Sequence, residues 1–162
     1  MLRTLLAAFT AVGLCAAAVA RDAKPVKIVH VPTGKVLAVA DDAEEAGARA
    51  ALAKDDPKSE AQRWKVEKDG EFLKLVHVKS GKVLDVNEDS KDEGAPIILW
   101  DDKPEGYDNQ RWAWAGDGQE RRLKSKSSEL VLDVDDEGKV VQKKSDEKAK
   151  GQLWKVVEVE KK

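Results

Sequence analysis

The sequence predicts an all-β fold made of three repeated units that close on themselves. A Gln-x-Trp motif occurs three times, at Gln62-Arg63-Trp64, Gln110-Arg111-Trp112 and Gln152-Leu153-Trp154. Between these motifs lie short tracts of alternating character, rich in β-branched residues and bounded by turn signals such as Ser80-Gly81. Similar units recurring along a chain indicate a repeat architecture, and the apolar spacing within each unit is that of strands.

Further matches place the repeats at about residues 25–72, 73–120 and 121–159. The tract Ile28-Val29-His30-Val31 returns as Leu75-Val76-His77-Val78, and Val83-Leu84-Asp85-Val86 returns as Val131-Leu132-Asp133-Val134. Three units are too few for a propeller, which closes with at least about four blades. A closed β fold of three units therefore fits the sequence better.

The segment 43–54 disagrees with this pattern. Its alanines, and the placing of Glu45 and Arg49 at helical spacing, favour a helix in isolation. A stretch this short nucleates poorly in water. We therefore expect the repeat register to prevail here, or to leave only one helical turn.

Residues 1–20 are predicted to be a secretory signal peptide. Arg3 supplies a positive start, the run from Leu5 to Val19 is apolar apart from Thr10, and Ala18-Val19-Ala20 has the small-x-small form of a cleavage site. The apolar run is shorter than the roughly 20 residues needed to cross a bilayer. We expect a mature domain of residues 21–162, secreted or located in the periplasm or cell envelope, with no membrane span after signal cleavage.

Composition argues against several classes of function. Lys and Arg number 29 against 31 for Asp and Glu, so no single-sign field exists to attract nucleic acid. The one cysteine, Cys15, lies in the predicted signal peptide, which leaves the mature protein without a disulfide or a thiol nucleophile. His30 and His77 occupy equivalent repeat positions, as scaffold residues do, and adjacent acids such as Asp101-Asp102 point in different directions. We expect no enzyme activity, no cofactor and no metal site.

The three Gln-x-Trp motifs beside a repeated Leu-Asp-Val tract resemble the ricin B-type lectin family, over residues 25–159. The resemblance implies a β-trefoil with pseudo-threefold symmetry, in which each unit offers one shallow pocket for sugar. Independently of the family, Gln and Trp two residues apart are expected on the same face of a strand. Trp64, Trp112 and Trp154 would then be core residues, and each Gln could satisfy one backbone donor and one backbone acceptor.

The middle unit carries the predicted carbohydrate-binding residues. In the family, as the resemblance implies, an Asp in the Leu-Asp-Val tract binds sugar hydroxyls, an aromatic residue further on stacks on the sugar, and an Asn before the motif glutamine completes the site. This chain matches at Asp85, Trp100, Asn109 and Gln110. One departure is Ile98, which stands where the family often has a Gln.

The first unit is predicted to be silent. Ala38 takes the place of the aspartate, Lys54 aligns with the aromatic residue, and Ala61 replaces the asparagine. None of these side chains offers a carboxylate, a ring or an amide to a sugar.

The third unit is predicted to hold at most a weak secondary site. It keeps Asp133 and places Gln142 where the middle unit has Ile98, but Lys144 replaces the aromatic residue and Gly151 replaces the asparagine. Asp133 and Gln142 are its candidate carbohydrate-binding residues.

The sequence thus predicts a secreted, non-catalytic lectin module that binds galactose-like or related sugars weakly through its middle unit. Low affinity is expected because one shallow pocket offers few contacts. The alternative is a structural or protein-interaction trefoil of the cell envelope that has lost sugar binding and uses its charged loops to contact a protein partner.

Overall fold

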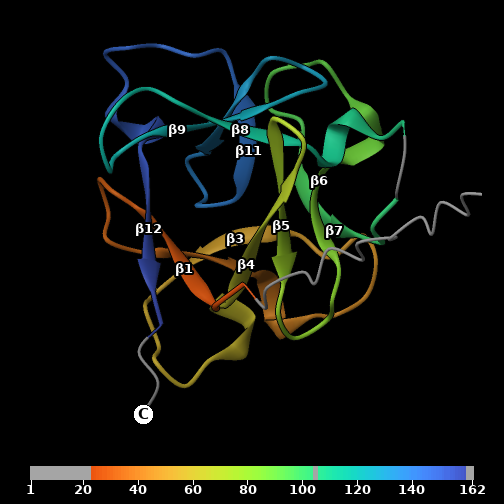
Figure 1. Ribbon diagram of the computed structural model, residues 1–162. Coiled ribbons are helices and arrows are strands. Elements are labelled where there is room, and N and C mark those ends of the chain that lie inside the picture. The colour runs from red at the N-terminus through yellow and green to blue at the C-terminus, as the bar shows by residue number, and fades with distance from the viewer. Residues whose placement is uncertain (1–22, 104–105, 160–162) are drawn as a thin grey trace, which may run out of the picture.

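The computed structural model describes residues 23–103 and 106–159, so the predicted signal peptide and Cys15 lie outside it. The described residues form twelve strands joined by turns (Figure 1). The strands are β1 (Val26–His30), β2 (Val36–Val39), β3 (Ala50–Ala53), β4 (Trp64–Asp69), β5 (Phe72–His77), β6 (Val83–Val86), β7 (Ile97–Trp100), β8 (Trp112–Ala115), β9 (Arg122–Ser125), β10 (Val131–Val134), β11 (Val140–Lys143) and β12 (Trp154–Glu158). Five short 3-10 helices accompany them: η1 (Ala40–Asp42), η2 (Glu60–Gln62), η3 (Asn87–Asp89), η4 (Asp108–Gln110) and η5 (Lys150–Gln152). None of the helices in these two ranges has the length and apolarity that a membrane crossing requires.

The strands form a barrel closed by three hairpins, which confirms the predicted β-trefoil. Strands β1, β4, β5, β8 and β9 pair in sequence, β12 pairs with β1, and an isolated bridge between Arg121 and Trp154 closes the ring. The hairpins β2–β3, β6–β7 and β10–β11 extend from β1, β5 and β9. Each unit therefore contributes four strands, and β5 begins one residue before the predicted start of the second repeat.

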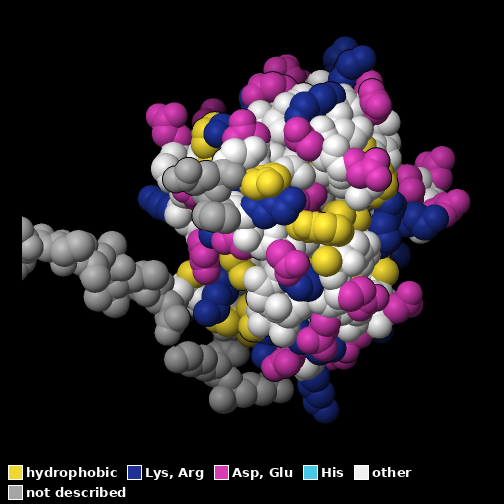
Figure 2. Space-filling model, turned by 90° about the vertical axis from the view of Figure 1, so that its right-hand side faces the viewer, with side chains coloured by type: hydrophobic (Ala, Val, Ile, Leu, Met, Phe, Trp, Pro, Cys, Tyr) yellow, Lys and Arg dark blue, Asp and Glu magenta, His cyan; other side chains and the backbone are white. Residues whose placement is uncertain are grey.

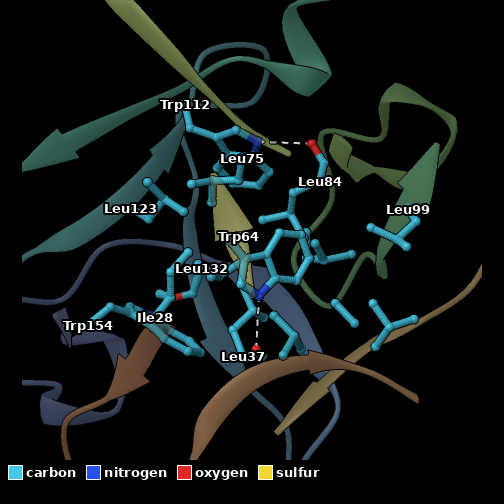
Figure 3. Close-up of a cluster of buried hydrophobic side chains, with 14 of the residues drawn as sticks. Ile28, Leu37, Trp64, Leu75, Leu84, Leu99, Trp112, Leu123, Leu132 and Trp154 are labelled. Atoms are coloured by element: carbon cyan, nitrogen blue, oxygen red, sulfur yellow. Dashed lines mark hydrogen bonds between the residues drawn. The ribbon is translucent and has the colours of Figure 1, made fainter. Parts of the chain in front are cut away.

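The core is organised around the tryptophans of the three motifs, and all three side chains have no exposed surface, as predicted. Each indole N–H donates to the backbone carbonyl of the leucine in the second strand of its own unit, and Figure 3 shows these rings among the buried leucines. The pairs and their Nε1 to O distances are Trp64 to Leu37 at 3.0 Å, Trp112 to Leu84 at 3.1 Å and Trp154 to Leu132 at 3.1 Å. The motif therefore fastens the barrel to each hairpin.

The glutamines of the motifs lie elsewhere than predicted. They end the 3-10 helices η2, η4 and η5 instead of sharing a strand with the tryptophan, because the chain makes a turn before each of β4, β8 and β12 begins. Their expected bonding is nevertheless present. Gln62 accepts from the backbone N–H of Asp56 and donates to the carbonyl of Lys54, both at 2.8 Å. The side chains of Gln110 and Gln152 make the same two kinds of bond in their own units.

Each hairpin loop also contacts the hairpin of the next unit. The Gly47 N–H donates to the Leu99 carbonyl, and the Gly94 N–H donates to the Gln142 carbonyl, each at 2.8 Å. The ring closes where the Leu52 N–H donates to the Gly138 carbonyl at 3.1 Å. The segment 43–54 takes part in this ring with a strand over Ala50–Ala53, so the repeat register prevails over its local helical preference.

We predict that Trp64→Phe lowers the free energy of unfolding by about 1–3 kcal/mol. The substitution keeps an apolar ring but leaves the buried Leu37 carbonyl without the indole donor. Urea denaturation followed by circular dichroism measures the change. Trp100→Phe is the control, because this indole is 37% exposed and its replacement should change the free energy by no more than about 0.5 kcal/mol. Equal losses in the two variants would contradict the anchoring role.

Candidate functional site

A hollow of about 500 Å³ lies beside the β6–β7 hairpin. The face of the molecule that carries this hairpin is turned to the viewer in Figure 2, where hydrophobic side chains form small patches among acidic and basic ones. The hollow is lined by Asp85, Asn87, Glu88, Asp89, Ile98, Trp100, Lys103, Gly106, Tyr107 and Asn109.

Three of the predicted residues line this hollow, and strand register places two of them. Asp85 lies opposite Ile98 in the β6–β7 pair, and Val83 lies opposite Trp100. Directly opposite residues share a face, and so do residues two apart, which sets Asp85 and Trp100 on the outward face. Asn109 reaches the hollow from η4. Ile98 lies in it as well, so the departure seen in the sequence brings an apolar group into the site.

Asp85 is a buried carboxylate held by two amides. It is 4% exposed, and its Oδ1 accepts from Asn109 Nδ2 at 2.9 Å while its Oδ2 accepts from Gln110 Nε2 at 2.8 Å. Burial raises its pKa to about 6, although the Gln110 hydrogen bond, the positive charge of Lys103 and the Asn109 hydrogen bond each act to lower it. Near neutral pH the group is therefore largely ionised and fixed in one orientation.

Gln110 supports the site without facing it. Its side chain has no exposed surface. Besides the bond to Asp85, its Nε2 donates to the Asp101 carbonyl at 2.9 Å, and its Oε1 accepts from the Lys103 N–H at 3.0 Å. The prediction that Gln110 contacts sugar directly is therefore corrected: it is a positioning residue for Asp85 and for the loop that follows β7.

Gln142 does not lie in a hollow beside Asp133. In the β10–β11 pair Asp133 lies opposite Val141, whereas Gln142 lies opposite Leu132 on the other face. The Gln142 side chain is fully buried and donates to the carbonyls of Ser90 and Asp92 in the middle unit, each at 2.9 Å. The prediction for Gln142 is wrong because aligning it with Ile98 was one residue out of register, which reverses the face.

In the third unit a lysine takes the position of the aromatic ring. Lys143, not Lys144, occupies the register position of Trp100. Its Nζ lies 3.9 Å from Asp133 Oδ1 and donates to the Val134 carbonyl at 3.3 Å. Asn109 Nδ2 bonds the equivalent pair of atoms in the middle unit. An ammonium thus replaces the amide, and no ring stands at this position to stack on a sugar.

The first unit has a hollow of about 500 Å³ that lacks the acid, the ring and the amide of the middle site. Strand register puts Ala53, not Lys54, at the position of Trp100, because Val36 lies opposite Ala53 as Val83 lies opposite Trp100. With Ala38 and Ala61, three alanines line this hollow in place of the acid, the ring and the amide. That the first unit does not bind sugar remains a prediction.

Sequence analysis missed two residues of the middle site, Lys103 and Tyr107. The Lys103 Nζ lies 4.1 Å from the centroid of the Tyr107 ring and 6.0 Å from that of Trp100. The sequence did contain a signal for Lys103, because the middle unit departs from the other two units at this position. Where the middle unit has Lys103, the other units have Asp56 and Asp146, which each accept a bond from the backbone two residues on.

A comparison with known families identifies the group to which this fold and these motifs belong. The sequence profile described as ricin-type β-trefoil lectin domain-like matches residues 17–100. The chain belongs to this family. A search of curated protein sequences finds no match.

Several solved structures share the fold of this chain. A designed threefold-symmetric protein, ThreeFoil, is 28% identical with a TM-score of 0.77, over 83% of this chain and 98% of that one. An exo-β-1,3-galactanase from Clostridium thermocellum is 32% identical with a TM-score of 0.77, over 85% of this chain and 31% of that one. The Polyporus squamosus lectin, solved with a sialylated epitope, shares the fold at 17% identity and a TM-score of 0.72, over 84% of this chain and 49% of that one. The family and these neighbours support a carbohydrate-binding module.

We predict that the free energy of unfolding depends on pH through the ionisation of Asp85. Its pKa of about 6 in the folded protein lies above the usual aspartate value of 3.8, so the stability it contributes is present below about pH 4 and is lost as the pH rises through about 6. The loss should be about 2 kcal/mol, less than the whole shift implies, because the carboxylate opens onto a solvated hollow.

Urea denaturation of the wild type and of Asp85→Ala between pH 4 and pH 7 measures this loss. Alanine is compatible with the position, since Ala38 occupies it in the first unit. The free energy of unfolding of the wild type should fall relative to that of the variant across this range. Parallel curves would show that the pKa of Asp85 is not raised.

Proposed function

We propose that this protein is a non-catalytic lectin module that binds galactose-like or related sugars through its middle unit. The observation that supports the proposal is the presence of Asp85, Trp100 and Asn109 around one hollow that opens to solvent. A carboxylate, an exposed indole and an amide are together a combination that suits a pyranose ring, which has hydroxyls at its edge and apolar C–H groups on its face.

Each group has capacity left for a ligand. The two carboxylate oxygens of Asp85 each accept one bond from the chain, and each keeps a lone pair for a sugar hydroxyl. Asn109 Nδ2 donates hydrogen bonds to Asp85 and to the Val86 carbonyl, so the Asn109 Oδ1 is the atom that would accept a hydrogen bond from a sugar hydroxyl. The Trp100 ring would cover the C–H face.

The similarity to the galactanase favours galactose as the first sugar to test. That protein is named for a β-1,3-galactan substrate, and at 32% identity this chain matches 31% of its length. The predicted signal peptide supports a location outside the cytoplasm, where polysaccharides and glycans are exposed. We therefore place the ligand in an extracellular glycan or polysaccharide.

The affinity of one such hollow for a single sugar should be low. A stacked ring and a few hydrogen bonds, each contributing about 0.5–1.5 kcal/mol net, are partly offset by the cost of association. The result is a Kd on the millimolar scale, which corresponds to a binding free energy of about −4 kcal/mol. Several copies of the module on one surface would bind a multivalent target more tightly.

We predict that Asp85→Ala, Trp100→Ala and Asn109→Ala each weaken galactose binding at least about tenfold. These variants reproduce residues that the first unit already carries at the same positions, so the fold should tolerate them. Titration of ¹⁵N-labelled protein with a panel of monosaccharides, followed by NMR shifts, measures Kd in the millimolar range. Asp133→Ala, the same change in the third unit, is the matched control and should leave the Kd unchanged.

Two results would count against this function. No shift with any sugar at tens of millimolar would reject sugar binding, and an unchanged Kd in the middle-unit variants would reject the site. If the wild-type protein is folded and binds no sugar, the protein-interaction alternative is favoured. A pull-down from deglycosylated envelope extract would then be expected to recover one protein partner.

A further inference from the structure

A second hollow adjoins the proposed sugar site. Its volume is about 210 Å³, and it lies among Asp69, Phe72, Asp108, Arg111 and Lys126. Gly106 and Tyr107 line both hollows. Tyr107 is 42% exposed, so it is accessible to a ligand. The two hollows are neighbours that share one wall.

One chain of hydrogen bonds links the two hollows. Gln110 donates to Asp85 Oδ2 at 2.8 Å and accepts from the Lys103 N–H at 3.0 Å. The Lys103 carbonyl accepts from Arg111 Nη2 at 3.1 Å, and Arg111 Nε donates to Asp69 Oδ2 at 2.5 Å. The backbone of Lys103 is thus held at its N–H and at its carbonyl. The carboxylates of Asp85 and Asp69, one in each hollow, belong to a single hydrogen-bonded frame.

The shared wall is particular to the middle unit. In the first and third units the motif glutamine accepts from a backbone N–H six residues before it, at Asp56 and at Asp146. In the middle unit the corresponding donor, Lys103, lies seven residues before Gln110. The additional residue belongs to the segment that carries Tyr107. The middle unit therefore has one residue more than the other units between this donor and the motif glutamine.

The second hollow has the same kinds of groups as the first. Asp69 and Asp108 are acceptors, Arg111 and Lys126 are donors, and Phe72 supplies an apolar ring. The Lys126 Nζ lies 2.7 Å from Asp108 Oδ1 and 4.9 Å from the centroid of the Phe72 ring. Arg111 is 7% exposed, and its Nη1 lies 3.8 Å from Asp102 Oδ1, so its guanidinium is held in place beside the hollow. Acceptors, donors and a ring surface suit the hydroxyls and C–H face of a sugar.

We propose that the ligand is an oligosaccharide of at least two sugar units that lies across Tyr107 with one unit in each hollow. This inference rests on the proposed function and makes its ligand class a sugar chain instead of a monosaccharide. Because the two sugar units are covalently linked, the second unit adds contacts without a second loss of translational freedom. Affinity should therefore rise from one sugar unit to two.

The experiment compares galactose with galactose disaccharides of β-1,3, β-1,4 and β-1,6 linkage in NMR titrations of the full mature chain. At least one disaccharide is expected to bind at least about tenfold more tightly than galactose. Phe72→Ala and Lys126→Met should each reduce this gain and leave the Kd for galactose unchanged. Lys124→Met is the matched control, since Lys124 is an equally exposed lysine that pairs with Glu129 instead of lining a hollow.

The results separate this inference from the proposed function. If galactose binds and no disaccharide binds more tightly, the second subsite is overturned and the proposed function stands. The same holds if the gain persists in the double variant of Phe72 and Lys126. If neither galactose nor any disaccharide binds, both proposals fall. Circular dichroism of each variant shows whether a lost response reflects unfolding instead.

Discussion

The structure depends on one repeated contact, the hydrogen bond from a buried indole to a leucine carbonyl. In the middle unit Trp112 donates to Leu84, and two residues earlier Gln110 donates to Asp85. Leu84 and Asp85 are neighbours on β6, so one points into the core and the other points outward. The Gln-x-Trp motif therefore holds the same strand at its structural residue and at its candidate ligand residue. The motif that maintains the fold also fixes the carboxylate of the site.

The three units show how this frame separates stability from binding. In the first unit Gln62 bonds only backbone groups, because Ala38 offers it no carboxylate. In the third unit Gln152 does bond Asp133, but Lys143 occupies the position of the ring. The middle unit alone combines a carboxylate with a ring and an amide. Burying that carboxylate costs free energy, which the two amide hydrogen bonds partly offset.

The fold could be predicted from the sequence because its main determinants are local and repeated. Apolar alternation indicated strands, and the three motifs indicated buried tryptophans. Asp85, Trp100 and Asn109 could be grouped because the family resemblance supplied positions that strand register then brought to one hollow. Register itself could not be predicted to one residue.

The errors have three different physical causes. Gln142 was assigned to the wrong face since a shift of one residue along a strand reverses the direction of every side chain. Lys103 and Tyr107 were missed because neither lies at one of the site positions that the resemblance supplied. Lys103 replaces the aspartate of the other units, and Tyr107 lies in a segment that has one additional residue. Gln110 has the residue type of a ligand residue, but its burial, which prevents contact with a sugar, cannot be seen in the sequence.

The ring of contacts between units also links the first unit to the hairpin that carries the candidate site. Gly47, in the hairpin loop of the first unit, donates its N–H to the Leu99 carbonyl, and Leu99 precedes Trp100. Gly47 has a φ of 91°, and a Cβ built on it would lie 3.9 Å from Trp100 Cζ3. The first unit thus holds the residue that precedes the indole of the second unit through a backbone hydrogen bond, and such a contact needs no acid, ring or amide. Its own ligand residues could be lost without loss of this role, because the neighbouring site depends on where its backbone lies.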